Sequence, residues 1–178
     1  MSTSTLLAIL IPVAVVLVLA GIAAWMYQRR RRLQDRFGPE YERTVESTGS
    51  RHAADTELHK RQARHDDLDI RELPAEERHR YTEAWNTVQQ RFVDRPEGAV
   101  SQADDLITRV MRDRGYPTAG YDQQLRELSV EHGRTLEHYR AAHEVNERSG
   151  KGQATTEELR GAMVHYRALF DELVGTAR

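Results

Sequence analysis

Residues 155–173 read TTEELRGAMVHYRALFDEL, and this stretch predicts a helix that carries its own start signal. Thr155 and Glu158 have the spacing of a capping box, in which two side chains bond the first free amides of a helix. Behind them, apolar residues recur every three or four positions, as on one buried helix face. They are Leu159, Met163, Tyr166, Leu169, Phe170 and Leu173. Such a helix needs neighbours that cover its apolar side.

Four earlier segments show the same periodicity, so the sequence supplies those neighbours. One begins at Pro74, and a second begins near Asp94–Glu97 and ends at Gly115. A third covers Tyr121–Leu128 and a fourth covers Leu136–Val145. No run alternates between apolar and polar residues as a half-buried strand does. We therefore predict an all-α bundle of four to five helices over residues 68–178.

The tetrapeptide His-Tyr-Arg-Ala occurs twice, at residues 138–141 and 165–168. No other run of this length matches when the sequence is compared with itself at this offset of 27 positions. We interpret the two copies as two helices that each bury the same kind of tyrosine.

The N-terminal region is different, because residues 6–27 read LLAILIPVAVVLVLAGIAAWMY and contain no charge. At 1.5 Å per residue they span about 33 Å, and a hydrocarbon core is about 30 Å thick. Trp25 and Tyr27 stand at one end, where amphipathic aromatics favour lipid headgroups. We predict a single transmembrane helix over Leu6–Tyr27, after a short tail of residues 1–5.

Arg29, Arg30, Arg31 and Arg32 follow this apolar run directly. Positive charge stays on the cytoplasmic side, so the prediction is a single-pass cell-membrane protein with its N-terminus outside. The same arginines could contact lipid headgroups or only set this topology. A secreted or extracytoplasmic anchored protein is the alternative, since small residues at 20–24 would suit cleavage.

Residues 28–67 are predicted to form a basic juxtamembrane segment followed by a charged stalk. Gly38-Pro39 interrupts the first part, and Pro39 suits the first turn of a new helix. Between Glu46 and Asp67 only Leu58 is a large apolar residue. That composition favours a solvated helix or a partly disordered segment.

Composition excludes several classes of protein. The chain has no cysteine, which excludes disulfides and thiolate metal sites. From Leu33 onward 22 basic residues face 28 acidic ones, a net charge of −6, whereas nucleic-acid binders carry excess positive charge. Glu76 and His79 have the spacing of a di-iron motif but lie opposite the predicted apolar stripe and lack a second such pair. We predict no cofactor, no metal, no catalytic residue and no nucleic-acid partner.

Arg109, Arg112 and Arg114 form a small basic cluster before Gly115-Tyr116-Pro117. In the functional interpretation, this cluster is a docking patch for an acidic or phosphorylated partner. In the structural interpretation, the three arginines are cations that stabilise a helix C-terminus, and Tyr116 folds back as part of the cap. We favour the structural interpretation.

Several longer motifs resemble a family of bacterial proteins that have an N-terminal membrane segment and no known activity. They include GPEY at 38–41, VQQRFVD at 88–94, VMRDRGYP at 110–117 and MVHYRALF at 163–170. The resemblance covers most of the chain after the arginines. It implies no catalytic residues.

These observations predict a non-enzymatic, membrane-tethered module that binds a protein partner. The expected partners are the lipid bilayer, an unidentified protein and, as an option, a second copy of the chain. A sensor or adaptor that responds to pH or a ligand is the first alternative. An enzyme of unknown type is the second, and no catalytic motif supports it.

Overall fold

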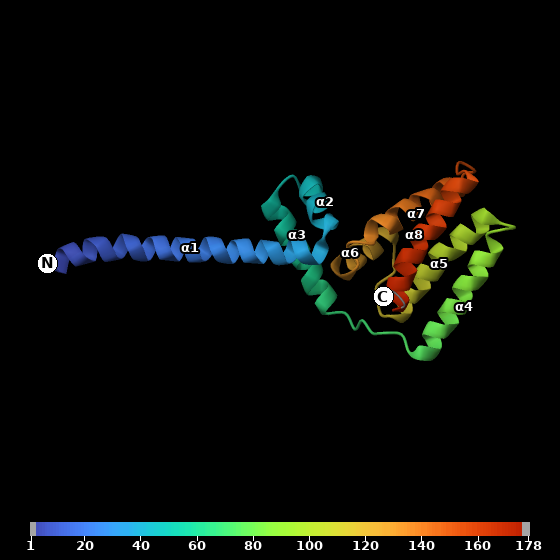
Figure 1. Ribbon diagram of the computed structural model, residues 1–178, viewed down its shortest axis with the longest axis horizontal. Coiled ribbons are helices and arrows are strands. Elements are labelled where there is room, and N and C mark those ends of the chain that lie inside the picture. The colour runs from blue at the N-terminus through green and yellow to red at the C-terminus, as the bar shows by residue number, and fades with distance from the viewer. Residues whose placement is uncertain (1–2, 176–178) are drawn as a thin grey trace.

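In a computed structural model, the described part of the chain, the backbone of residues 3–175, consists of helices joined by loops (Figure 1). Side chains are described for residue 13 and for residues 15–175. The helices are α1 (Thr3–Phe37), α2 (Pro39–Thr48), α3 (Arg51–Asp66), α4 (Ala75–Arg91), α5 (Pro96–Asp113), α6 (Tyr121–Glu131), α7 (Leu136–Ser149) and α8 (Thr156–Val174). No strand occurs between residues 3 and 175, so the all-helical character and the helical bundle are confirmed.

The bundle forms because the apolar stripes of α4, α5, α7 and α8 meet in one core. The indole of Trp85 stacks on Phe170 with ring centroids 4.7 Å apart, which joins α4 to α8. Ile107 and Met111 of α5 are fully buried beside them. Thr155 and Glu158 form the capping box that the sequence predicts at the start of α8. α5 starts near the predicted position, but without a side-chain cap.

The two His-Tyr-Arg-Ala segments lie against each other where α7 packs on α8. Tyr139 and Tyr166 are both fully buried, and their rings meet edge to face with centroids 6.1 Å apart. The imidazoles of His138 and His165 stack at 4.9 Å. The interpretation that both helices bury the same kind of tyrosine is confirmed.

Residues 28–37, the start of the predicted basic juxtamembrane segment and charged stalk, continue α1, whereas α2 and α3 fold back as a helical hairpin. This hairpin includes nearly all of Glu46–Asp67, where the sequence predicts a solvated helix or a partly disordered segment. Gly38 adopts φ 54° and separates α1 from α2, with Pro39 in the first turn as predicted. α2 and α3 pack on each other and on α1, and α3 and α1 also pack on α6. A second, smaller core holds them together, made of Leu33, Phe37, Tyr41, Leu58 and Val130.

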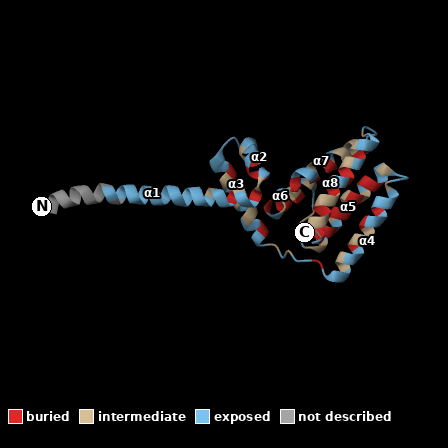
Figure 2. Cartoon of the chain, in the orientation of Figure 1, coloured by how far each residue is buried: buried red, intermediate tan, exposed pale blue. Residues whose placement is uncertain are grey.

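The N-terminal part of α1 projects away from both cores, and its described side chains are exposed (Figure 2). Along the described part of the chain no helix combines the length and hydropathy that crossing a bilayer requires. This finding contradicts the predicted transmembrane helix over Leu6–Tyr27. It also corrects the predicted single-pass topology and its alternative, the extracytoplasmic anchored form.

The physical reason is the charge that follows the apolar residues. The side chains of residues 6–12 and 14 lie outside the described residues, and residues 1–2 of the predicted tail lie outside them altogether. Within the described residues, Arg29, Arg30, Arg31 and Arg32 follow the apolar side chains of α1 at once. A longer segment of these residues would therefore carry several charges into the bilayer core, where each charge is costly.

Gly133, which follows α6, lies close against the C-terminal end of α1. A Cβ atom on this residue would lie 2.4 Å from the carbonyl oxygen of Phe37 and 3.1 Å from that of Ser129. Both contacts are with backbone, which cannot rotate away.

We expect Gly133→Ala to lower the free energy of unfolding by about 1–3 kcal/mol, because backbone must shift to admit the methyl group. Gly161→Ala in α8 is the matched control, since a Cβ there meets nothing within 4 Å. That change should stabilise by about 0.5–1 kcal/mol through helix propensity. Chemical denaturation measures both, and equal effects of the two substitutions would contradict the proposed contact.

Candidate functional site

Polar side chains from four parts of the chain meet where the hairpin contacts the bundle. We call this group the junction network. His65 is near the end of α3, and Tyr116 follows α5. The network consists of His65, Tyr116, Glu131, His132, Thr135 and Glu172.

The contacts of the network form a chain through two carboxylates. Glu131 accepts a hydrogen bond from the Tyr116 hydroxyl at 2.9 Å, and His65 Nε2 lies 3.3 Å from its other oxygen. Glu172 lies 2.8 Å from His132 Nδ1 and accepts a hydrogen bond from the Thr135 hydroxyl. Tyr116 Oη and His132 Nε2 are 3.4 Å apart, so the two halves touch.

These partners change the proton affinity of both carboxyl groups. Burial raises the pKa of Glu131, but hydrogen bonds from Tyr116 and His65 outweigh it, and the net pKa is lowered. Burial likewise opposes the hydrogen bonds from His132 and Thr135 at Glu172, and its net pKa is lowered too. Burial raises the pKa of the Tyr116 hydroxyl, which therefore remains a donor. The network favours charged carboxylates at neutral pH.

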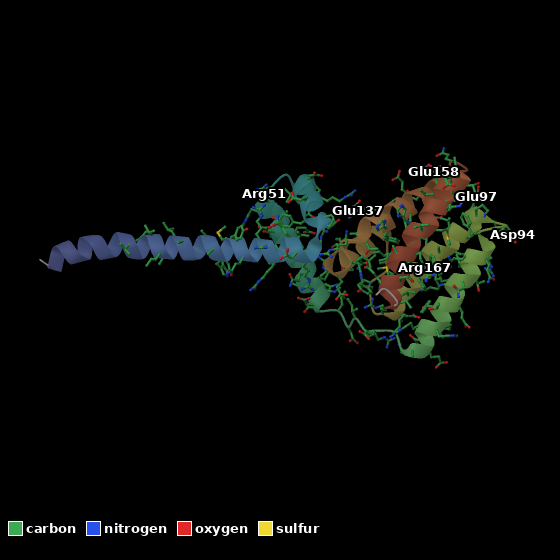
Figure 3. The ribbon with its side chains drawn as sticks, in the orientation of Figure 1. Arg51, Asp94, Glu97, Glu137, Glu158 and Arg167 are labelled. Carbon is green, nitrogen blue, oxygen red and sulfur yellow. The ribbon has the colours of Figure 1, made fainter. Side chains whose placement is uncertain are left out.

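A second polar contact fastens the hairpin to the bundle on α7. Glu40 in α2 is 5% exposed, and Arg140 donates to both of its oxygens at 2.7 and 2.9 Å. Arg61 of α3 lies 3.5 Å from the same carboxylate. Glu137, one turn earlier in α7, accepts hydrogen bonds from Arg43 and Arg140 and lies on the same junction in Figure 3. The two parallel hydrogen bonds from Arg140 to Glu40 are the strong, bidentate form of an arginine–carboxylate pair.

His138 and His165 form a third candidate feature, on the outer side of the α7–α8 contact. Their Nδ1 atoms are 2.8 Å apart, so one ring donates and the other accepts. Burial lowers the pKa of His165, and the neighbouring His138 lowers it further. Protonation of both rings would place two like charges at this distance.

The arginine run of the sequence lies where α1 crosses α3. Arg29 donates from Nε to His59 Nε2 at 2.7 Å and lies over the Trp25 ring. Burial lowers the pKa of His59, and Arg29 adds to the effect. Arg30 lies over Tyr41. Arg31 and Arg32 are exposed.

The three arginines of the possible docking patch are not equivalent. Arg114 is half-buried, where it donates to the carbonyl oxygens of Arg71 and Leu173 at 3.1 and 3.2 Å. Gly115 has φ 95°, and the amide of Tyr116 bonds the carbonyl of Met111, so the helix end closes as a Schellman cap. Arg109 and Arg112 are exposed. Arg114 thus has a structural role, and docking by the other two stays a prediction.

Glu76 and His79, which have the spacing of a di-iron motif, gather no further ligand among the described residues. Glu76 and His79 are exposed, and His79 lies 3.7 Å from Glu83. Among the described residues, no three side chains of histidine, aspartate or glutamate are placed to hold a metal ion.

Sequence reasoning missed the junction network and the Glu40–Arg140 pair. Glu40 and Arg140 are 100 residues apart in the chain, and no short motif links the members of either group. The single available signal was Glu40 within a segment that also supplies Tyr41, since a charged residue beside a core tyrosine needs a partner.

Comparison of the chain with protein-family models, with curated proteins and with solved structures gives no match. The resemblance to a bacterial family therefore stays a prediction.

We expect Arg140→Met to lower the free energy of unfolding by about 3 kcal/mol, because it leaves the buried Glu40 carboxylate with only its weaker contact to Arg61. The double variant Glu40→Met/Arg140→Met should lose less, since no buried charge remains. Arg160→Met is the control: its pair with Glu157 is exposed and is worth less than about 1 kcal/mol. A double variant less stable than Arg140→Met would contradict this account.

Stability should also fall on acidification below about pH 6.5, the pKa of histidine in an unfolded chain. The folded state lowers the pKa of His165, so the unfolded state binds the proton more readily as the pH drops. His165→Gln should flatten the dependence of melting temperature on pH between 8 and 5.5. His79→Gln, at an exposed site, should leave it unchanged, and identical pH profiles for wild type and His165→Gln would refute the prediction.

Proposed function

We propose that this chain is a non-enzymatic helical interaction module that assembles through α1 with the apolar helices of a protein partner. The observation that carries the proposal is the exposure of large apolar side chains on every side of α1. Leu17 is 66% exposed, Ile22 50% and Tyr27 66%. Each such side chain gains roughly 1.5–3 kcal/mol when it is fully buried.

The pattern of these residues indicates how they would be covered. Val16, Leu17, Val18 and Leu19 are consecutive and all exposed, so they point in four directions around the helix. One partner groove covers a single stripe. A helix that is apolar all round is instead enclosed by several neighbours. The proposed partner therefore supplies more than one apolar helix.

The rest of the chain is consistent with a folded module that is attached to its partner through α1. Apart from Val93 and Val164, the large apolar side chains described outside α1 are not exposed. The two cores are closed around buried side chains, and the junction network fixes the hairpin on the bundle. The bundle thus presents a charged surface next to α1, the helix that is proposed to bind the partner.

A photoreactive amino acid placed at Leu17 of the full-length chain tests this proposal in the cells that make it. We expect a protein adduct of discrete mass, and we expect Leu17→Asp/Val18→Asp to prevent co-purification of the same protein. The photoreactive residue at Val93, which is 83% exposed on the bundle, is the control and should give no such adduct. Adducts with lipid alone, or with another copy of this chain alone, would contradict assembly with a partner protein.

A second candidate is an adaptor that responds to pH. Two features favour it: the imidazole pair of His138 and His165, and the two histidines of the junction network. Protonation of His165 would change the charge where α7 meets α8, which is how histidine switches act. The pH profiles of wild type and His165→Gln described above test the first of these.

A further inference from the structure

A groove of ≈ 380 Å³ lies between α1 and α3, apart from the features that the proposed function uses. Arginine and other hydrogen-bond donors line it, and its described lining includes no carboxylate. The residues that matter here are Trp25, Arg29, Arg32, Arg36, His59 and Gln62.

The spacing of the three arginines places their guanidinium groups along one wall. Arg29, Arg32 and Arg36 are three and four residues apart, so they share one face of α1. His59 and Gln62, three residues apart on α3, form the opposite wall. The bond from Arg29 to His59 holds one guanidinium in place and uses one of its five N–H donors.

The protein neutralises only part of the positive charge in this groove. Elsewhere arginines meet carboxylates, as Arg43 meets Glu137 at 2.9 Å and Arg140 meets Glu40 at 2.7 Å. Among the described residues, no carboxylate oxygen lies within 4.0 Å of Arg29 or Arg32. Arg36 reaches only the exposed Asp66, at 3.4 Å. The chain carries more acidic than basic residues, and yet Arg29 and Arg32 have no carboxylate partner among the described residues.

We propose that this groove binds a phosphate-bearing anion, with the phosphate between Arg29, Arg32 and Arg36. A guanidinium group matches the oxygens of phosphate with two parallel hydrogen bonds. Gln62 adds an amide donor from α3, and the Trp25 ring borders the space left for the substituent of a phosphomonoester. A soluble phosphomonoester and a phospholipid headgroup present the same chemistry to this groove.

Isothermal titration calorimetry on the full-length chain at constant ionic strength tests the assignment. One arm uses inorganic phosphate and a soluble phosphomonoester. The other uses vesicles of phosphatidylcholine with and without phosphatidic acid. We expect saturable binding in at least one arm. Binding in the first arm would identify the ligand as a soluble phosphate compound, and binding only to vesicles with phosphatidic acid would identify it as a lipid headgroup.

The matched pair of variants is Arg32→Gln and Arg31→Gln. Both remove one charge from the same arginine run, but Arg31 does not line the groove. We expect Arg32→Gln to weaken binding at least about tenfold, through the loss of charge-assisted hydrogen bonds, and Arg31→Gln to change it little. Equal weakening by both variants would mean attraction to diffuse charge and would overturn the proposal. Absence of binding in both arms would overturn it as well.

Discussion

The buried carboxylate of Glu40 is the constraint on which the junction of this molecule depends. A charge inside a protein must be matched at once by an opposite charge and by hydrogen bonds. Arg140 provides both, and it reaches Glu40 from a helix 100 residues away in the chain. Once this pair forms, α2 has a fixed place on α7. α1 and α3 follow, because they share the small core with Tyr41.

The junction network adds a second attachment of a different kind. Its carboxylates connect the end of α3 to α6 and the start of α7 to the end of α8, so one polar surface links both cores. Apolar packing alone would let two small cores rotate against each other. Directional hydrogen bonds between them restrict that rotation. The network therefore helps to fix the orientation of the hairpin on the bundle.

The bundle was predictable from sequence because each helix carries its own apolar stripe and a local start or stop signal, such as Thr155 with Glu158 or Gly115. The hairpin was not, since α3 buries only Ala54, Leu58 and His65 in a strongly polar segment. Local pattern favours a solvated helix there, and the covering surface on α6 is distant in sequence. The arginine run was visible, but its partner groove depends on how α1 crosses α3. The prediction of a transmembrane helix was wrong, because it rested on the length and charge of the sequence alone.

The paired tetrapeptides of α7 and α8 have a consequence for how this interface could vary. α7 and α8 meet through the same four residues, with Tyr139 against Tyr166 and His138 against His165, so like side chains are paired. The arginines that follow break this relation, because Arg140 reaches across to Glu40 while Arg167 lies over Trp85. One copy of the same four residues fastens the bundle to its neighbour, and the other covers its own core. A mutation shared by both copies would thus disturb two unrelated surfaces.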